Sequence, residues 1–181
     1  MDILKEFQTS LRRVKKRLLL DIMNDLKYIN YDIVFQEVPN EISLVFNISG
    51  CPHKCEGCHS KYLWEYTGNY MKDDYIKIID SYKNYITCVC FMGGDQNIAE
   101  LYTMCRTIKD MIPNMKICIY SGLQSITSFS EIISDNLIDY LKIGPYVKSL
   151  GGLDSCETNQ KMYKIYGNDM TDITYLFRKK G

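Results

Sequence analysis

Apolar and polar positions along the chain form blocks that predict strands and helices in alternation. Four apolar blocks rich in branched and aromatic residues predict buried strands; they span residues 41–49, 85–92, 115–120 and 137–144. Three intervening blocks carry apolar positions at helical spacing; they span residues 73–84, 97–112 and 125–135. This alternation is typical of parallel βαβ units, so we predict an α/β fold.

The two ends of the chain follow other patterns. In residues 3–29 apolar side chains recur every three or four positions, which predicts one amphipathic helix or two short ones. The basic run at 12–17 fits the solvated face of such a helix, and a partner-docking surface is the alternative. We therefore expect a helical N-terminal extension over residues 1–30 and a core domain over residues 31–181. Two β-like segments around "YGND" (166–169) suggest a hairpin.

Each predicted core strand stops at a glycine or a turn, at Gly50, Gly93, Gly122 and Gly144. In parallel α/β architecture the carboxyl ends of the strands lie on one side, where sites form. We therefore expect the cysteine-containing loop after the first strand, the Gly-Gly-Asp loop and the Ser-Gly loop to converge.

Composition narrows the classes of protein. The 22 basic and 22 acidic residues cancel, so no broad basic field invites nucleic acid. We expect no membrane association, because no apolar run is long enough to span a bilayer and the N-terminus does not read as a secretory signal. Of the eight cysteines, Cys88, Cys90 and Cys118 lie in predicted strands, which argues against a disulfide framework. A cytoplasmic, reducing location is expected.

Cys51, Cys55 and Cys58 crowd into the loop after the first predicted strand. Zinc could take all three with His53 or His59 as fourth ligand. A disulfide could use two and leave one over. An iron–sulfur cluster normally takes four cysteines, so three would leave one iron without a protein ligand. The position at a strand end favours this open site, since an open metal position binds a substrate or cofactor.

The spacing C-x3-C-x2-C in "CPHKCEGCH" resembles that of the radical S-adenosylmethionine enzymes, and "FMGGD" (91–95) resembles their glycine-rich motif. The resemblance implies a [4Fe-4S] cluster held by Cys51, Cys55 and Cys58. It also implies S-adenosylmethionine as cofactor, with the methionine end bound by the Gly-Gly-Asp loop. The positions implied in cofactor binding are Gly57, Cys58, His59, Gly93, Gly94, Asp95 and Ser121.

Four further segments resemble the activating proteins of the anaerobic (class III) ribonucleotide reductases. They are "GCPHKCEGCHSKYLWEYTG" (50–68), "IYSGL" (119–123), "LKIGPY" (141–146) and "GGLDSCETNQKMY" (151–163). Lys142 departs from the pattern, since many relatives have an acidic residue there. The resemblance covers about residues 31–166 and implies a partial (β/α) TIM-like barrel of five or six mostly parallel strands.

The same resemblance implies a function and partners. The expected reaction uses a 5′-deoxyadenosyl radical to remove a hydrogen atom from a glycine of the reductase large subunit, leaving a glycyl radical. A flavodoxin- or ferredoxin-type protein would supply electrons. Two alternatives stay open: another small radical enzyme, such as a different glycyl-radical activase or one of deazaguanine synthesis, and a zinc-binding or electron-carrier module.

Overall fold

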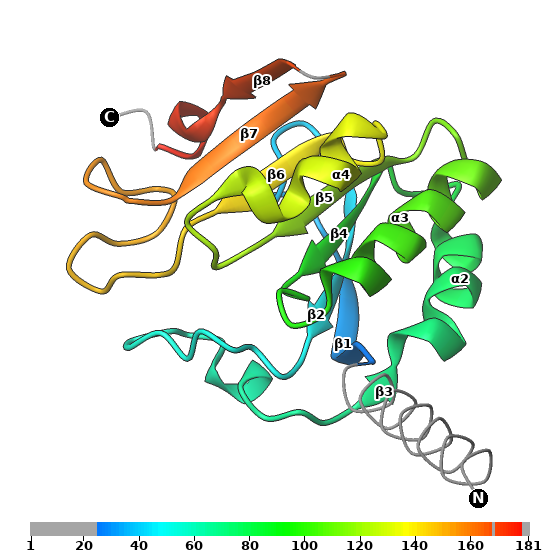
Figure 1. The fold of residues 1–181 in the computed structure, drawn as a ribbon, viewed down its shortest axis with the longest axis horizontal. Helices are drawn as coiled ribbons and strands as arrows, with labels where there is room; N and C mark the ends of the chain where they lie inside the picture. The colour runs from blue at the N-terminus through cyan, green and yellow to red at the C-terminus, as the bar shows by residue number, and fades with distance from the viewer. Residues whose placement is uncertain (1–24, 168, 179–181) are drawn as a thin grey trace, which may run out of the picture.

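The computed structural model describes residues 25–167 and 169–178. In this part of the chain one sheet of eight strands runs in the order β3-β1-β2-β4-β5-β6-β7-β8 (Figure 1). The strands are β1 (Lys27–Val34), β2 (Ser43–Ile48), β3 (Asn69–Tyr70), β4 (Cys88–Met92), β5 (Lys116–Tyr120), β6 (Tyr140–Ile143), β7 (Lys161–Tyr166) and β8 (Asp169–Asp172).

The four predicted core strands are confirmed as β2, β4, β5 and β6, which pair in parallel at the centre of the sheet. The predicted hairpin is confirmed as the antiparallel pair β7 and β8. The expectation of five or six mostly parallel strands is wrong, because antiparallel strands extend the sheet at both ends. The described strands show no barrel closure, since β3 and β8 end the sheet.

The helices lie between the parallel strands, as predicted. They are α2 (Met71–Tyr82), α3 (Ile98–Met111) and α4 (Ser130–Ser134), and short 3-10 turns form η1 (Lys61–Leu63), η2 (Ile126–Phe129) and η3 (Thr174–Phe177). Figure 1 shows α2, α3 and α4 on the same face of the sheet. The Asn97 side chain caps α3 by accepting from Glu100 N–H, which satisfies one of the free amides of the first turn.

Alternation along the central strands divides the core into two layers. On the helix side, Phe46 of β2 stacks on Phe91 of β4 at 6.0 Å between ring centroids. On the opposite side, Cys90 of β4 and Cys118 of β5 belong to a second buried cluster. This cluster also contains Val38, from the segment before β2, and Ile173, just before the C-terminal turn η3. The cysteines predicted to lie in strands are therefore ordinary core residues.

One boundary differs from the prediction. Residues 27–30, expected in a helix, belong to β1, which pairs antiparallel with β2. The segment "KYINYDIV" is rich in aromatic and branched side chains, and the free edge of β2 offers it a full set of backbone partners. The domain boundary expected after residue 30 thus falls inside a strand. The rest of the helical pattern expected over residues 3–29, up to residue 24, lies outside the described residues.

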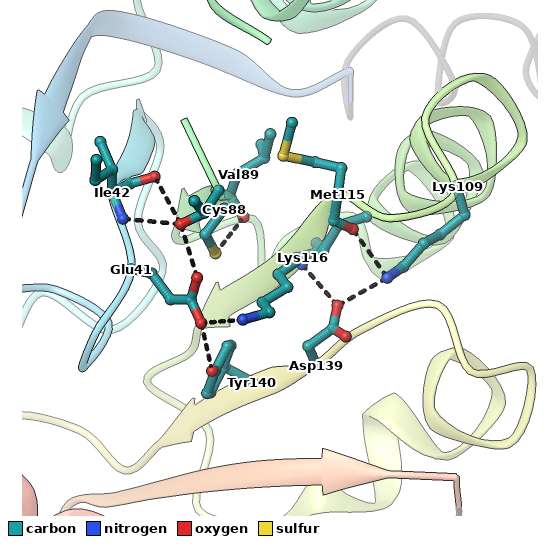
Figure 2. Close-up of polar contacts among 11 residues, drawn as sticks. Glu41, Ile42, Cys88, Val89, Lys109, Met115, Lys116, Asp139 and Tyr140 are labelled. Carbon is teal, nitrogen blue, oxygen red and sulfur yellow. Dashed lines mark hydrogen bonds and ion pairs between the residues drawn. The ribbon is translucent and has the colours of Figure 1, made fainter. Parts of the chain in front are cut away.

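A polar network secures the amino ends of the central strands (Figure 2). Glu41, 6% exposed, accepts from Lys116, from Thr87 at 2.7 Å and from Tyr140 Oη at 2.8 Å. Asp139 accepts from Lys109 Nζ and from the backbone N–H of Ile117, each at 2.8 Å. The network links four strand starts at the end of the sheet opposite the cysteine loop.

Nowhere in the described ranges is a helix both long and apolar enough to cross a bilayer.

Candidate functional site

The carboxyl ends of β2, β4, β5 and β6 form the floor of the candidate site. On the face opposite the helices, the last residue of each of these strands lies in one row across the sheet. The row is Asn47, Met92, Tyr120 and Lys142. The loops that follow hold the predicted site residues. Figure 1 shows the loop after β2 and the long connection from β6 to β7 extending on the same side.

The cysteine loop is fixed at both ends by the backbone. Cys51 N–H donates to Leu63 O at 2.9 Å, and Cys58 N–H donates to Cys55 O at 3.2 Å. Gly57 has a φ of +76°, which a glycine adopts without strain, and a Cβ there would press on the Lys148 side chain at 3.1 Å. Sequence thus places a tight turn between the second and third cysteine.

The three thiols of this loop are unpaired and partly exposed. Cys156 is exposed in another loop, and the other four cysteines are buried; these are Cys88, Cys90, Cys105 and Cys118. Among the described residues, no three Cys, His, Asp or Glu side chains already stand in a metal-binding arrangement. The loop therefore brings the three cysteines to one place without gathering their sulfurs. Burial raises the pKa of the Cys51 thiol, which backbone N–H groups of His53 and Lys54 partly offset.

Asp95 joins three of the converging loops. Its Oδ2 accepts from Gly122 N–H at 2.8 Å and lies 2.6 Å from His53 Nε2. Its Oδ1 is buried without a hydrogen-bond partner, and the side chain is only 3% exposed. The predicted convergence of the cysteine, Gly-Gly-Asp and Ser-Gly loops is thereby confirmed.

Glycines make this meeting possible. Gly93 and Gly94 have φ values of +110° and +102°, and a Cβ on Gly94 would lie 2.8 Å from Leu101. A Cβ on Gly122 would lie 2.3 Å from the His53 ring. The ring therefore packs directly on the Gly122 backbone.

The remaining residues of these loops make no contact that assigns them a role in binding. Ser121 is buried, and its Oγ accepts from Leu123 N–H at 2.9 Å, so it shapes its own turn. Gly57 and His59 are exposed. Asn159 and Gln160 brace the turn after β6: Asn159 Nδ2 donates to Pro145 O at 2.9 Å.

The sequence alone indicated no role for Lys142. Its ammonium donates to Gly144 O at 2.6 Å and to Ser121 O at 3.3 Å, and the residue is 8% exposed. Burial lowers its pKa to about 8, although Asp95 and the three loop cysteines act in the opposite direction. The signal available in the sequence was a single charged residue within the apolar run "LIDYLKIG".

Comparison with known proteins agrees with this arrangement. The family described as a 4Fe-4S single cluster domain matches residues 42–160, from the residue before β2 to the residue before β7. The chain belongs to the 4Fe-4S single cluster domain family.

Individual relatives of this 4Fe-4S domain share one name. The anaerobic ribonucleoside-triphosphate reductase-activating protein of Enterobacteria phage T4 is 28% identical over 117 residues, which are 59% of this chain and 72% of the phage protein. The protein of that name from Escherichia coli K12 is 27% identical over 139 residues, 71% of this chain and 88% of the bacterial protein. No solved structure gives a significant match.

The residues present fit the cluster of a 4Fe-4S domain. Three unpaired thiols on one loop supply the donor chemistry that iron–sulfur clusters use. The unpartnered Asp95 Oδ1, with backbone carbonyls of two glycines before it, fits the ammonium end of an amino acid, since a buried acceptor without a donor is costly. The site therefore places a loop with three thiols beside a carboxylate oxygen that has no hydrogen-bond partner.

Proposed function

We propose that this 4Fe-4S protein activates an anaerobic ribonucleoside-triphosphate reductase. The relatives that bear this name are matched over 72% and 88% of their length. The observation that carries the proposal is the meeting of the cysteine loop with Asp95, because a cluster and an amino-acid cofactor must bind side by side for this chemistry.

In this proposal Cys51, Cys55 and Cys58 hold three irons of a [4Fe-4S] cluster. The other cysteines support the count of three, since four are buried in the core and Cys156 lies in the loop between β6 and β7. The fourth iron then has no protein ligand and can bind the cofactor.

S-adenosylmethionine is the proposed cofactor. Asp95 Oδ1 and the carbonyl groups of Gly93 and Gly94 would accept from its amino group. Backbone of Gly57, Cys58 and His59, and the buried Ser121, would line the rest of the binding site. A bound, reduced cluster would supply the electron that splits the cofactor into methionine and a 5′-deoxyadenosyl radical, and this radical would take a hydrogen atom from a glycine Cα to become 5′-deoxyadenosine.

The protein would supply position and shielding. Asp95 would keep the amino group beside the cysteine loop, and the row beneath it, in which Lys142 is buried and Tyr120 partly buried, would limit access of water. The proposed partner is the large subunit of the reductase. A flavodoxin- or ferredoxin-type donor would reduce the cluster in the cytoplasm, where thiols stay reduced.

The decisive experiment is activation in a defined mixture. Anaerobically reconstituted protein, S-adenosylmethionine, a reductant and an anaerobic ribonucleotide reductase should give a glycyl doublet in electron paramagnetic resonance. Cys55→Ser should abolish the doublet, while Cys156→Ser, a change outside the loop, should leave it intact.

Other outcomes identify the alternatives. Formation of 5′-deoxyadenosine without a glycyl signal would point to a different radical enzyme. One zinc per chain, with no iron or sulfide after anaerobic reconstitution, would show that the protein is a zinc-binding module.

A further inference from the structure

Lys142 is the one buried basic residue in the described part of the chain. It is the last residue of β6 on the face opposite the helices, in register with Tyr120 of β5. Its side chain therefore lies at the carboxyl end of the strand, next to the loops of the site. Two backbone carbonyls, those of Gly144 and Ser121, hold its ammonium at the carboxyl end of the sheet.

The ammonium lies beside the loops of the site, because Ser121 O accepts from it and the next residue, Gly122, donates its N–H to Asp95 Oδ2. Asp95 and all three loop cysteines act on Lys142 electrostatically, and each favours its charged form. Two neutral carbonyls do not compensate a buried ammonium in full, and such a charge is costly unless an anion lies near. The pKa of Lys142, lowered to about 8 by burial, reflects that cost in the chain alone.

We propose that Lys142 supplies a fixed positive charge that favours reduction of a cluster held by Cys51, Cys55 and Cys58. The inference rests on the cluster site of the proposed function, but not on the identity of the protein that is activated. A cluster becomes more negative by one charge when it gains an electron, so a nearby cation stabilises the reduced state more than the oxidised state. Lys142 would thus act as a positioning charge without touching the reacting atoms.

The test is the midpoint potential of the reconstituted cluster, measured without S-adenosylmethionine or reductase. Lys142→Met, which keeps the length and removes the charge, should lower the potential, so that the ratio of reduced to oxidised cluster at a fixed applied potential falls at least about threefold. Lys142→Arg should retain most of the wild-type value. The matched control is Lys77→Met on the exposed face of α2, which removes the same charge far from the site and should change nothing.

A second measurement separates this role from a structural one. The metal-free Lys142→Met chain should unfold at the same temperature as wild type or higher, because the variant no longer buries an unpaired charge. A lower unfolding temperature with an unchanged potential would show that Lys142 only supports the fold. Weaker binding of S-adenosylmethionine with an unchanged potential would make it a cofactor ligand instead; both results overturn the proposal.

The failures of the two proposals are distinguishable. If Lys142→Met does not take up a cluster, Lys142→Gln, which keeps a donor for the Gly144 carbonyl, replaces it, and an unchanged potential in that variant also overturns the inference. A cluster that responds to Lys142 in a protein that makes no glycyl radical would overturn the proposed function alone. A glycyl radical with a potential indifferent to Lys142 would overturn the inference alone.

Discussion

His53 Nε2 lies 2.6 Å from Asp95 Oδ2, so a residue inside the cysteine loop is bound to the acidic residue at the end of β4. The contact leaves Asp95 with one committed oxygen and one buried oxygen without a partner. The two halves of the proposed site, the cluster loop and the amino-group acceptor, are therefore mechanically coupled.

Removing this contact should loosen the cysteine loop. His53→Ala deletes a hydrogen bond to a buried carboxylate, of a kind that contributes about 1.5–3 kcal/mol. We expect the reconstituted cluster to be lost to a chelator several-fold faster, measured by the decay of its visible absorbance. Lys61→Ala, an exposed change just beyond the loop, is the control and should decay at the wild-type rate.

Gly122→Ala should reproduce the effect of His53→Ala, because its new Cβ would displace the imidazole ring. If both changes act by breaking the same contact, the double variant should lose its cluster no faster than either single variant. Additive rates would show that the two residues act separately.

Asp95→Asn should weaken cofactor binding more than cluster binding. The amide keeps the size of the side chain but removes the charge that favours an ammonium group, so the dissociation constant for S-adenosylmethionine should rise about tenfold or more. Equilibrium dialysis on the reconstituted protein measures it. An unchanged constant would remove Asp95 from the proposed cofactor site.

The network around Glu41 predicts acid-dependent stability. Burial alone would raise the pKa of Glu41, but hydrogen bonds from Lys116, Thr87 and Tyr140 outweigh it and hold the pKa below its usual value. A lowered native pKa contributes stability above the unfolded pKa, about 4.3, and that contribution is lost as pH falls through the native value.

Glu41→Gln should therefore reduce the free energy of unfolding by about 2–3 kcal/mol at pH 7 and by less near pH 3. Denaturant titrations at both values check this. Asp80→Asn, which breaks the exposed pair with Lys83, is the control and should cost under about 1 kcal/mol at either pH. Equal losses for Glu41→Gln at both values would contradict the assigned pKa direction.

The cysteines should divide into two groups in the folded, metal-free protein. The partly exposed thiols of Cys55 and Cys58 and the exposed thiol of Cys156 should react quickly with an alkylating reagent, and Cys51, whose thiol pKa is raised by burial, should follow more slowly. The other four should react only after unfolding, because the thiolate is the nucleophile and burial raises the pKa of thiols such as those of Cys88 and Cys118. Mass spectrometry of the alkylated peptides gives the order, and fast labelling of any buried thiol in the native state would contradict the structure.

Sequence reasoning reached the parts of this fold that local patterns encode. The four parallel strands follow from apolar runs that end in glycine, and the meeting of their loops follows from the geometry of parallel strands. The start of β1 was missed because helical spacing continues through Leu26, and only pairing with β2 makes the next residues extended. Pairing between segments is a tertiary effect that a window of sequence does not contain.

Two features of the site were not predicted because they too depend on contacts between distant segments. The His53–Asp95 contact joins positions 42 residues apart, and nothing in either motif alone indicates it. Lys142 was visible as a charge in an apolar strand, but its meaning depends on which loop lies above its face of the sheet.

Neither layer of the core includes Cys51, Cys55 or Cys58, and the Glu41 network secures the sheet from its far end. We therefore expect the chain to fold without the cluster. A cluster destroyed by oxygen would leave an intact scaffold, so repair would require fresh iron and sulfide and no new polypeptide.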